Sequence, residues 1–142
     1  MRALILLLAP IASAALCGCQ TPHAFPKPDA TWQTRVGQLQ YVGGGRSVIG
    51  DCVVSRRGAT DFQLEFSSGP GFPLLRLSRA GQIARAEGVL ARGAWQGDPQ
   101  QAPEQVRGWM RVAHSRAVPG SETRQIIDSP ETGERFVFAF SN

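Results

Sequence analysis

The sequence predicts one mainly β domain with one or two helices, in which a curved antiparallel sheet curls around a helix or a ligand. Several short segments alternate apolar and polar residues, which is typical of strands with one buried face. One later segment, residues 103–113, spaces its apolar residues as an amphipathic helix does. Strands flanking one helix favour a sheet packed on that helix.

The N-terminus has the layout of a secretory signal. Arg2 supplies a positive charge, and residues 3–16 form an apolar run. This run is shorter than the ~20 residues that a spanning helix needs, and Pro10 interrupts it. The run ends in Leu16-Cys17-Gly18-Cys19, which resembles the bacterial lipobox: a leucine three residues before the cysteine and a small residue just before it.

That resemblance implies cleavage after residue 18 and lipidation of Cys19, whose acyl chains would anchor the protein to a membrane. Cys17 is a poorer attachment site because the bulky Leu16 precedes it. An ordinary cleaved signal and an uncleaved anchor are the alternatives. Gln20, in place of the aspartate that retains many lipoproteins at the inner membrane, favours the outer membrane, facing the periplasm.

Residues 19–31 are expected to be a tether. They contain Pro22, Pro26 and Pro28 and few apolar side chains, a composition typical of an extended spacer reaching at most ~3 Å per residue. The folded domain is expected to span residues 32–142.

Composition excludes several classes of function. After loss of residues 1–18 and lipidation of Cys19, only Cys52 has a free thiol, so no disulfide can form within the mature chain. Cys52 lies in an apolar run, which favours a buried role over a reactive one. The net charge is +4, but apart from Arg56-Arg57 the arginines are scattered, which argues against nucleic acid as a partner.

The strands are predicted in chain order. Residues 34–42 and 47–55 flank a glycine turn, and residues 61–67 alternate most clearly. A short strand follows at 74–78, and residues 82–90 hold a fifth and sixth strand that are weakly marked.

The last elements are a helix and a hairpin. Pro103 is expected at the first helical position, and Val106, Trp109, Met110 and Ala113 then form a single apolar stripe. Pro119-Gly120 follows the helix. Residues 124–128 and 135–141 are expected to pair across a turn at 130–133, with three phenylalanines on one face.

The sequence offers little chemistry. His114 is the only histidine of the folded part, and a Cys52–His114 dyad is less favoured than a histidine that contacts the last carbonyls of the helix. No spacing of His, Cys or carboxylates suits a metal, and no serine-nucleophile motif occurs. The triple glycine at 43–45 precedes a strand and is therefore a turn and not a phosphate loop. We therefore expect that the protein is not an enzyme and binds no cofactor.

Residues 69–73 place the apolar Phe72 within a turn rich in glycine and proline. Such turns run over the surface, so Phe72 is either exposed or folded back as a lid on the core.

The order of these elements from residue 32 to residue 112 resembles the LolB family of outer-membrane lipoprotein receptors. The likeness is carried by the strand TRVGQLQYV after a tryptophan, by DFQLEF running through a Pro/Gly loop into LLRL, and by a proline-initiated helix with the V-x-x-W-M pattern. It implies an incomplete barrel, its mouth filled by helices, whose apolar concave face holds acyl chains. It also implies that Phe72 matches the apolar residue of a protruding loop that helps to place cargo in the membrane.

The resemblance assigns the apolar inward positions to ligand contact, although such positions are more often plain core. They are Leu39, Tyr41, Phe62, Leu64, Phe66, Leu75, Leu77, Trp109, Met110, Phe136, Phe138 and Phe140. Only a hairpin follows the helix, where the family continues with more strands, so the resemblance implies a smaller or more open cavity. Two alternatives stay open: a structural lipoprotein that binds an envelope protein through its sheet edge or the Phe72 loop, and a small hydrolase using Cys52 or His114.

Overall fold

The computed structural model describes residues 23–142. The predicted signal peptide, the predicted lipidation site Cys19 and the first part of the predicted tether lie outside the described residues. The described chain contains the strands β1 Gln33–Gly43, β2 Arg46–Arg57, β3 Asp61–Ser67, β4 Pro73–Ala80, β5 Ile83–Gly88, β6 Gly93–Gly97, β7 Arg124–Ser129 and β8 Glu134–Phe140, the helix α1 Glu104–His114, and the short 3-10 helices η1 Val89–Ala91 and η2 Pro99–Gln101.

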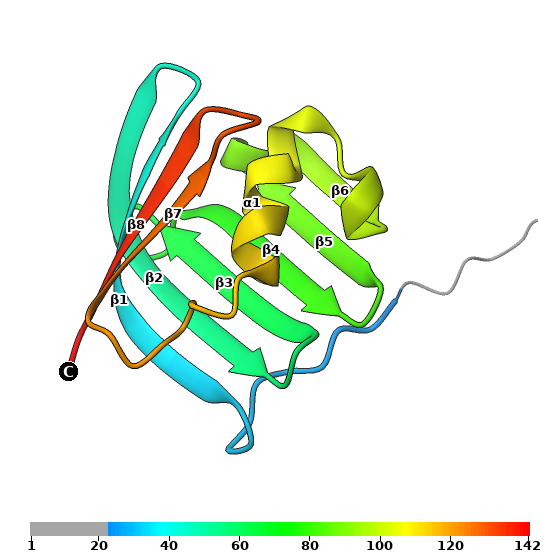
Figure 1. Ribbon diagram of the computed structural model, residues 1–142, viewed down its shortest axis with the longest axis vertical. Helices are drawn as coiled ribbons and strands as arrows, with labels where there is room; N and C mark the ends of the chain where they lie inside the picture. Colours follow the sequence, from blue (N-terminus) through cyan, green and yellow to red (C-terminus); the bar gives the residue numbers. More distant parts are fainter. Residues whose placement is uncertain (1–22) are drawn as a thin grey trace, which may run out of the picture.

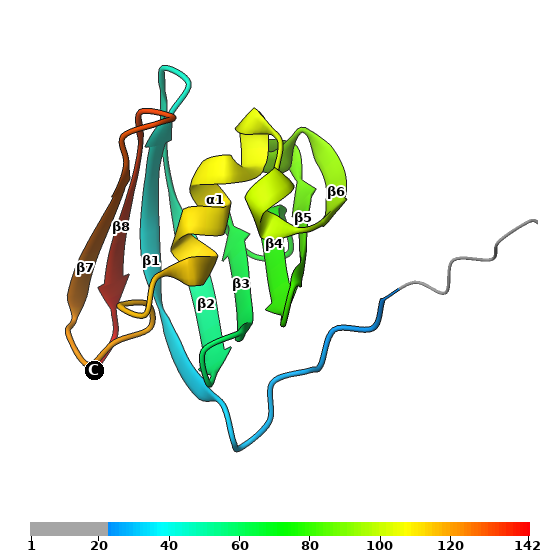
Figure 2. The same ribbon diagram turned by 45° about the vertical axis from the view of Figure 1, so that its right-hand side comes forward.

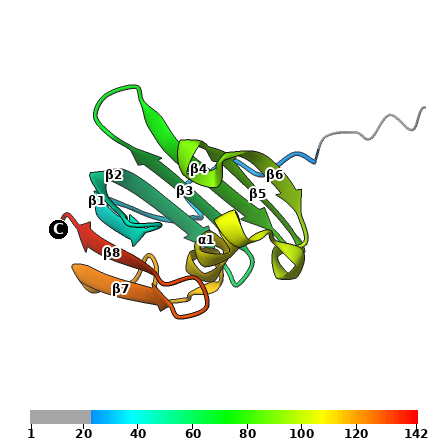
Figure 3. The ribbon, with the colours of Figure 1, turned by 90° about the horizontal axis from the view of Figure 1, so that it is seen from above.

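All strands form one antiparallel sheet in the order β6-β5-β4-β3-β2-β1-β8-β7. The sheet is not closed, because β6 and β7 do not pair with each other and remain its two edges. Figures 1 and 2 show that the sheet is curved and that α1 lies on its concave side. Seen from above, β7 and β8 lie on one side of α1 and β5 and β6 on the other (Figure 3). The predicted class, a mainly β antiparallel sheet with one α-helix, is confirmed.

Most predicted elements are present within a few residues of their expected bounds, with two differences. The sixth strand is β6, at Gly93–Gly97, and not within residues 82–90, where β5 is followed by η1. The helix begins at Glu104, because Pro103 has an extended backbone (ψ 160°) and is the N-cap residue. Neither difference moves a residue from one face of the sheet to the other.

The core lies between the concave face of the sheet and α1. The predicted stripe of the helix, with Val106, Trp109 and Met110 at its centre, is buried there. The indole of Trp109 is fully buried; its centroid lies 5.0 Å from the stacked ring of Tyr41 and 4.7 Å from that of Phe136. These contacts fix the helix on the sheet, since aromatic pairs at such distances add to the free energy of burial.

The end of α1 is held by a buried cation. The guanidinium of Arg56, which extends inward from β2, donates hydrogen bonds to the carbonyls of Ala113 (2.9 Å), Ser115 (2.7 Å) and Val118 (2.9 Å). It lies 4.7 Å from the centroid of the Phe62 ring. Burial, with smaller contributions from nearby arginines, lowers the pKa of Arg56 to about 10. A positive charge satisfying the last carbonyls of a helix is stabilising.

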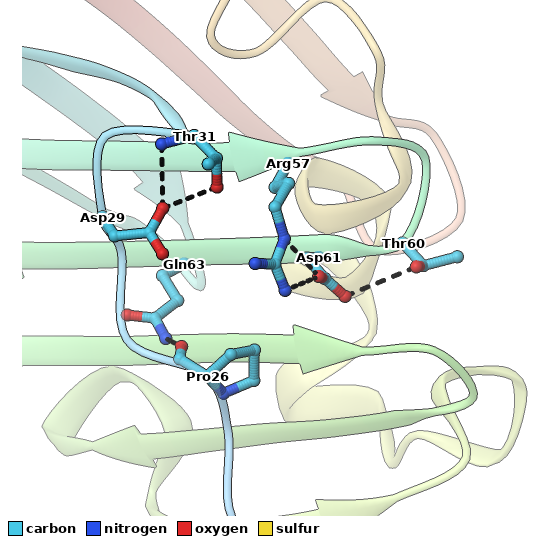
Figure 4. Close-up of polar contacts among 7 residues, drawn as sticks. All are labelled: Pro26, Asp29, Thr31, Arg57, Thr60, Asp61 and Gln63. Carbon is cyan, nitrogen blue, oxygen red and sulfur yellow. Dashed lines mark hydrogen bonds and ion pairs between the residues drawn. The ribbon is translucent and has the colours of Figure 1, made fainter.

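Part of the predicted tether lies against the sheet (Figure 4). The side-chain amide of Gln63, on the outer face of β3, donates to the carbonyl of Pro26. The carboxylate of Asp29 accepts hydrogen bonds from the backbone and hydroxyl of Thr31. Trp32 is buried, and the guanidinium of Arg57 lies 5.1 Å from its ring. We call residues 26–32 the strap, because they cross the outer face at the ends of β2 and β3.

No helix among residues 23–142 is long and apolar enough to cross a membrane.

Candidate functional site

The residues assigned to ligand contact lie together, but they are buried. Each has at most 9% of its surface exposed, and all belong to one continuous hydrophobic cluster. They are Leu39, Tyr41, Phe62, Leu64, Phe66, Leu75, Leu77, Trp109, Met110, Phe136, Phe138 and Phe140. In this structure, therefore, α1 and the side chains of the sheet fill the concave face.

Phe72 is exposed, which answers the question that the sequence left open. In the folded chain, 64% of its surface is exposed. Phe72 closes the loop between β3 and β4, where the Ser68 amide donates a hydrogen bond to the Phe72 carbonyl at 3.2 Å. Gly69 and Gly71 have φ values of 79° and 78°, in the region that favours glycine. The loop thus presents one phenyl ring to the surroundings.

Val89 is a second exposed apolar residue at the same end of the sheet, with 63% of its surface exposed. It follows Gly88, whose Cα lies so close to the Leu74 carbonyl that a Cβ at this position would be 2.5 Å away. Since Leu74 is two residues from Phe72, the β3–β4 loop and η1 border the same edge of the molecule. The sequence analysis did not single out Val89.

The outer face of the sheet carries further apolar residues among polar ones. Val36 and Val53 are cross-strand partners on β1 and β2, with 56% and 42% of their surfaces exposed. Ile126 on the edge strand β7 is 51% exposed. Between β1 and β7, the strand β8 presents Arg135, Val137 and Ala139 on the same face, and Val137 is the cross-strand partner of Ile126.

A polar cavity lies at the mouth of the curved sheet. Its volume is about 230 Å³, and it is lined by Tyr41, Gly44, Leu90, Arg92, Glu104, Gln105, Thr132 and Glu134. Glu134 is buried, with 7% of its surface exposed, and accepts a hydrogen bond of 2.7 Å from the Tyr41 hydroxyl. Burial and this hydrogen bond raise the pKa of Tyr41 above its ordinary value, so the phenol stays protonated and donates.

Glu134 was not predicted as a site residue, although the sequence contains one signal for it. Glu134 precedes Phe136 and Phe138 at the two-residue period of β8, so it lies on the inward face with them. A carboxylate at an inward position is uncommon unless it has a partner. The partner, Tyr41, lies directly across from Phe136 on β1.

The structure does not join Cys52 and His114. Cys52 is buried in β2, whereas His114 ends α1 and its Nδ1 lies 2.7 Å from the Met110 carbonyl oxygen. Burial raises the pKa of the Cys52 thiol to about 12, which opposes formation of the nucleophilic thiolate. Within residues 23–142, no group of His, Cys, Asp or Glu side chains is arranged to hold a metal ion.

We predict that Cys52 of the folded protein resists iodoacetamide at pH 8 and reacts at once in guanidinium chloride, because the buried thiol stays protonated. Mass spectrometry of the alkylated chain measures both rates. The raised pKa also makes the free energy of unfolding depend on pH. Above pH ~9 the folded state keeps the thiol proton, whereas the unfolded thiol loses it. The contribution of Cys52 to stability is therefore lost as the pH rises from ~9 towards 12. Equal alkylation of native and unfolded protein would contradict the burial of this thiol.

The comparisons with known proteins leave the family open: no protein-family model matches the sequence, and no curated protein matches it.

Proposed function

We propose that this chain is a lipid-anchored lipoprotein of the bacterial envelope, held at the outer membrane through Cys19, whose domain binds acyl chains and catalyses no reaction. The open, curved sheet around α1 is then the incomplete barrel that the LolB-like sequence pattern implies. The observation that carries the proposal is the exposure of Phe72: an unpaired phenyl ring on a short loop is a ready contact for an apolar ligand.

The strap supports a particular orientation of the domain. Arg57, at the end of β2, pairs with Asp61, at the start of β3. Pro26 and Trp32 are held at this end of the two strands, whereas the Phe72 loop leaves the opposite end of β3. An anchor at Cys19 lies seven residues before Pro26, a distance of at most about 25 Å of extended chain. The strap therefore meets the sheet at the end opposite the Phe72 loop and leaves this loop uncovered.

The filled core limits where an acyl chain can bind. Because the candidate lining residues are buried beneath α1, a chain enters the concave face only if this helix moves aside. The contact area of α1 with the sheet includes Trp109, so this movement is costly. We propose that acyl chains first contact Phe72, with entry beneath α1 as a later step.

We predict that Phe72→Glu weakens binding of an acylated peptide by roughly tenfold, because burying the phenyl ring against an acyl chain contributes about 1.5–3 kcal/mol. The melting temperature is expected to stay unchanged, since the ring makes no core contact. Fluorescence titration with a dansylated, acylated peptide measures the affinity. Ile126→Glu is the matched control, an equal change of charge on the exposed edge strand β7. Equal affinities of the two variants would contradict the assignment, and a large loss of thermal stability in Phe72→Glu would place Phe72 in the core.

A second candidate is a non-enzymatic lipoprotein that binds an envelope protein. The filling of the concave face by the chain's own side chains favours it, as do the two open sheet edges, β6 and β7, which can accept a strand from a partner. The discriminating result is a protein that co-purifies in fixed stoichiometry and is lost when an edge strand is blocked by proline.

A further inference from the structure

We propose that the cavity at the mouth of the sheet is a binding site for a primary ammonium group, carried by a free amine or by an amine-bearing lipid head group. This site is separate from the Phe72 loop and shares only Tyr41 with the buried apolar face, so it stands whether or not the proposed acyl-chain function holds. The site consists of one buried carboxylate and the polar side chains that line the cavity with it.

The carboxylate of Glu134 has bonding capacity left over. Its Oε2 accepts from the Tyr41 hydroxyl, while no donor in residues 23–142 bonds to its Oε1. This oxygen is not among the fully enclosed side-chain atoms of the described residues that lack a partner, so it keeps some contact with solvent. An ammonium ion in the cavity would donate to this oxygen and neutralise the charge.

Two glycines make room for this carboxylate. A Cβ on Gly43 would lie 2.5 Å from the Tyr41 hydroxyl oxygen and 2.9 Å from Cγ of Glu134. A Cβ on Gly108, in α1, would collide with Oε1 of Glu134. The β1–β2 hairpin and α1 therefore both pack closely against the Glu134 side chain, which holds this side chain at the cavity wall.

The rest of the lining suits an amine. Tyr41, which also lines the cavity, holds the carboxylate through its hydroxyl, whereas its ring is 9% exposed and stacks on Trp109. Glu104 and Gln105, at the start of α1, add a second carboxylate and an amide oxygen, and Thr132 adds a hydroxyl oxygen. The lining thus combines several residues that carry oxygen acceptors with the apolar Leu90 and the cation Arg92.

One cation also lines the cavity, and it distinguishes the two sources of the amine. Arg92 has a φ of 54°, the only positive value at a non-glycine residue in the described chain, and such conformations cost energy. Its guanidinium can pair with an anion next to the amine, such as the phosphate of a head group. A volume of about 230 Å³ has room for ethanolamine joined to a phosphate.

The test uses isothermal titration calorimetry on the mature protein in a non-ionic detergent, with ethanolamine and glycerophosphoethanolamine as probes. Saturable binding is expected, and Glu134→Gln, which keeps the shape of the side chain, is expected to weaken it roughly tenfold or more by removing the charged acceptor. Glu131→Gln is the control, because Glu131 is exposed on the neighbouring turn and does not line the cavity. It should bind as the wild type does.

The Arg92→Gln variant shows whether the site takes a lipid head group or a free amine. If this variant loses affinity for glycerophosphoethanolamine alone, the site takes a head group; equal affinities for both probes in wild type and variant indicate a free amine. Should Glu134→Gln unfold the protein, Glu104→Gln, at an exposed position, replaces it and is expected to weaken binding several-fold. Absence of saturable binding of either probe up to roughly 50 mM, a range that covers even weak sites, would overturn the proposal, as would unchanged affinity in the folded glutamine variants.

Discussion

Replacing Trp109 by alanine is expected to lower the free energy of unfolding by about 3–5 kcal/mol, the usual cost of removing a large aromatic side chain from a core. The indole is fully buried and contacts the rings of Tyr41, Phe66 and Phe136 at once, so its loss separates α1 from the centre of the sheet. For a domain of this size, that loss is a large part of the total stability. Denaturant unfolding followed by far-UV circular dichroism measures it.

The control for Trp109 is Arg107→Ala, on the exposed side of the same helix. Alanine has the highest helix propensity, so a change of less than about 0.5 kcal/mol is expected. If Trp109→Ala cost no more than Arg107→Ala, the concave face would not be packed as described, and an open ligand cavity would regain support.

Arg56→Met is expected to destabilise the fold by about 3 kcal/mol. Methionine keeps much of the volume but leaves the carbonyls of Ala113, Ser115 and Val118 without their donor, and buried unpaired carbonyls are costly. The loss should appear first at the helix end, as faster hydrogen exchange over residues 110–118, measured by mass spectrometry.

Arg57→Met, at the next position of β2, is the matched control. Arg57 points to the outer face, where it pairs with the partly buried Asp61 at 2.7 Å. An exposed pair contributes at most about 1 kcal/mol, so this variant should keep its helix end protected. Equal effects at the two positions would show that the Arg56 hydrogen bonds do not hold α1.

The sequence predicted the faces of the strands well, because a two-residue period leaves little ambiguity when one face is buried. Phe62, Leu64 and Phe66 share the inward face as expected. β6 was misplaced because Gly93–Gly97 lacks alternation; it forms through its pairing with β5, opposite Ala86 and Glu87. Tertiary pairing of this kind leaves no local signal.

The candidate site was harder to predict than the fold. An apolar inward residue has the same sequence pattern whether it lines a cavity or fills a core, and only the position of α1 on the sheet distinguishes the two. The contact of the strap with the sheet could not be predicted either, because a proline-rich segment is typical of a free spacer. The hydrogen bond from Gln63 to Pro26 joins residues far apart in sequence. The Phe72 loop was predictable as a surface turn from its glycines and proline, but the exposure of Phe72 itself was not.

Native mass spectrometry of the domain from Gln20 onward, gently purified from an envelope extract, tests the proposed acyl-chain binding most directly. The account predicts bound species with the mass of a lipid or an acylated peptide, and their loss in Phe72→Glu but not in Ile126→Glu. A clean mass of the protein alone, unchanged after incubation with an acylated peptide, would contradict acyl-chain binding and leave the protein-partner function in its place.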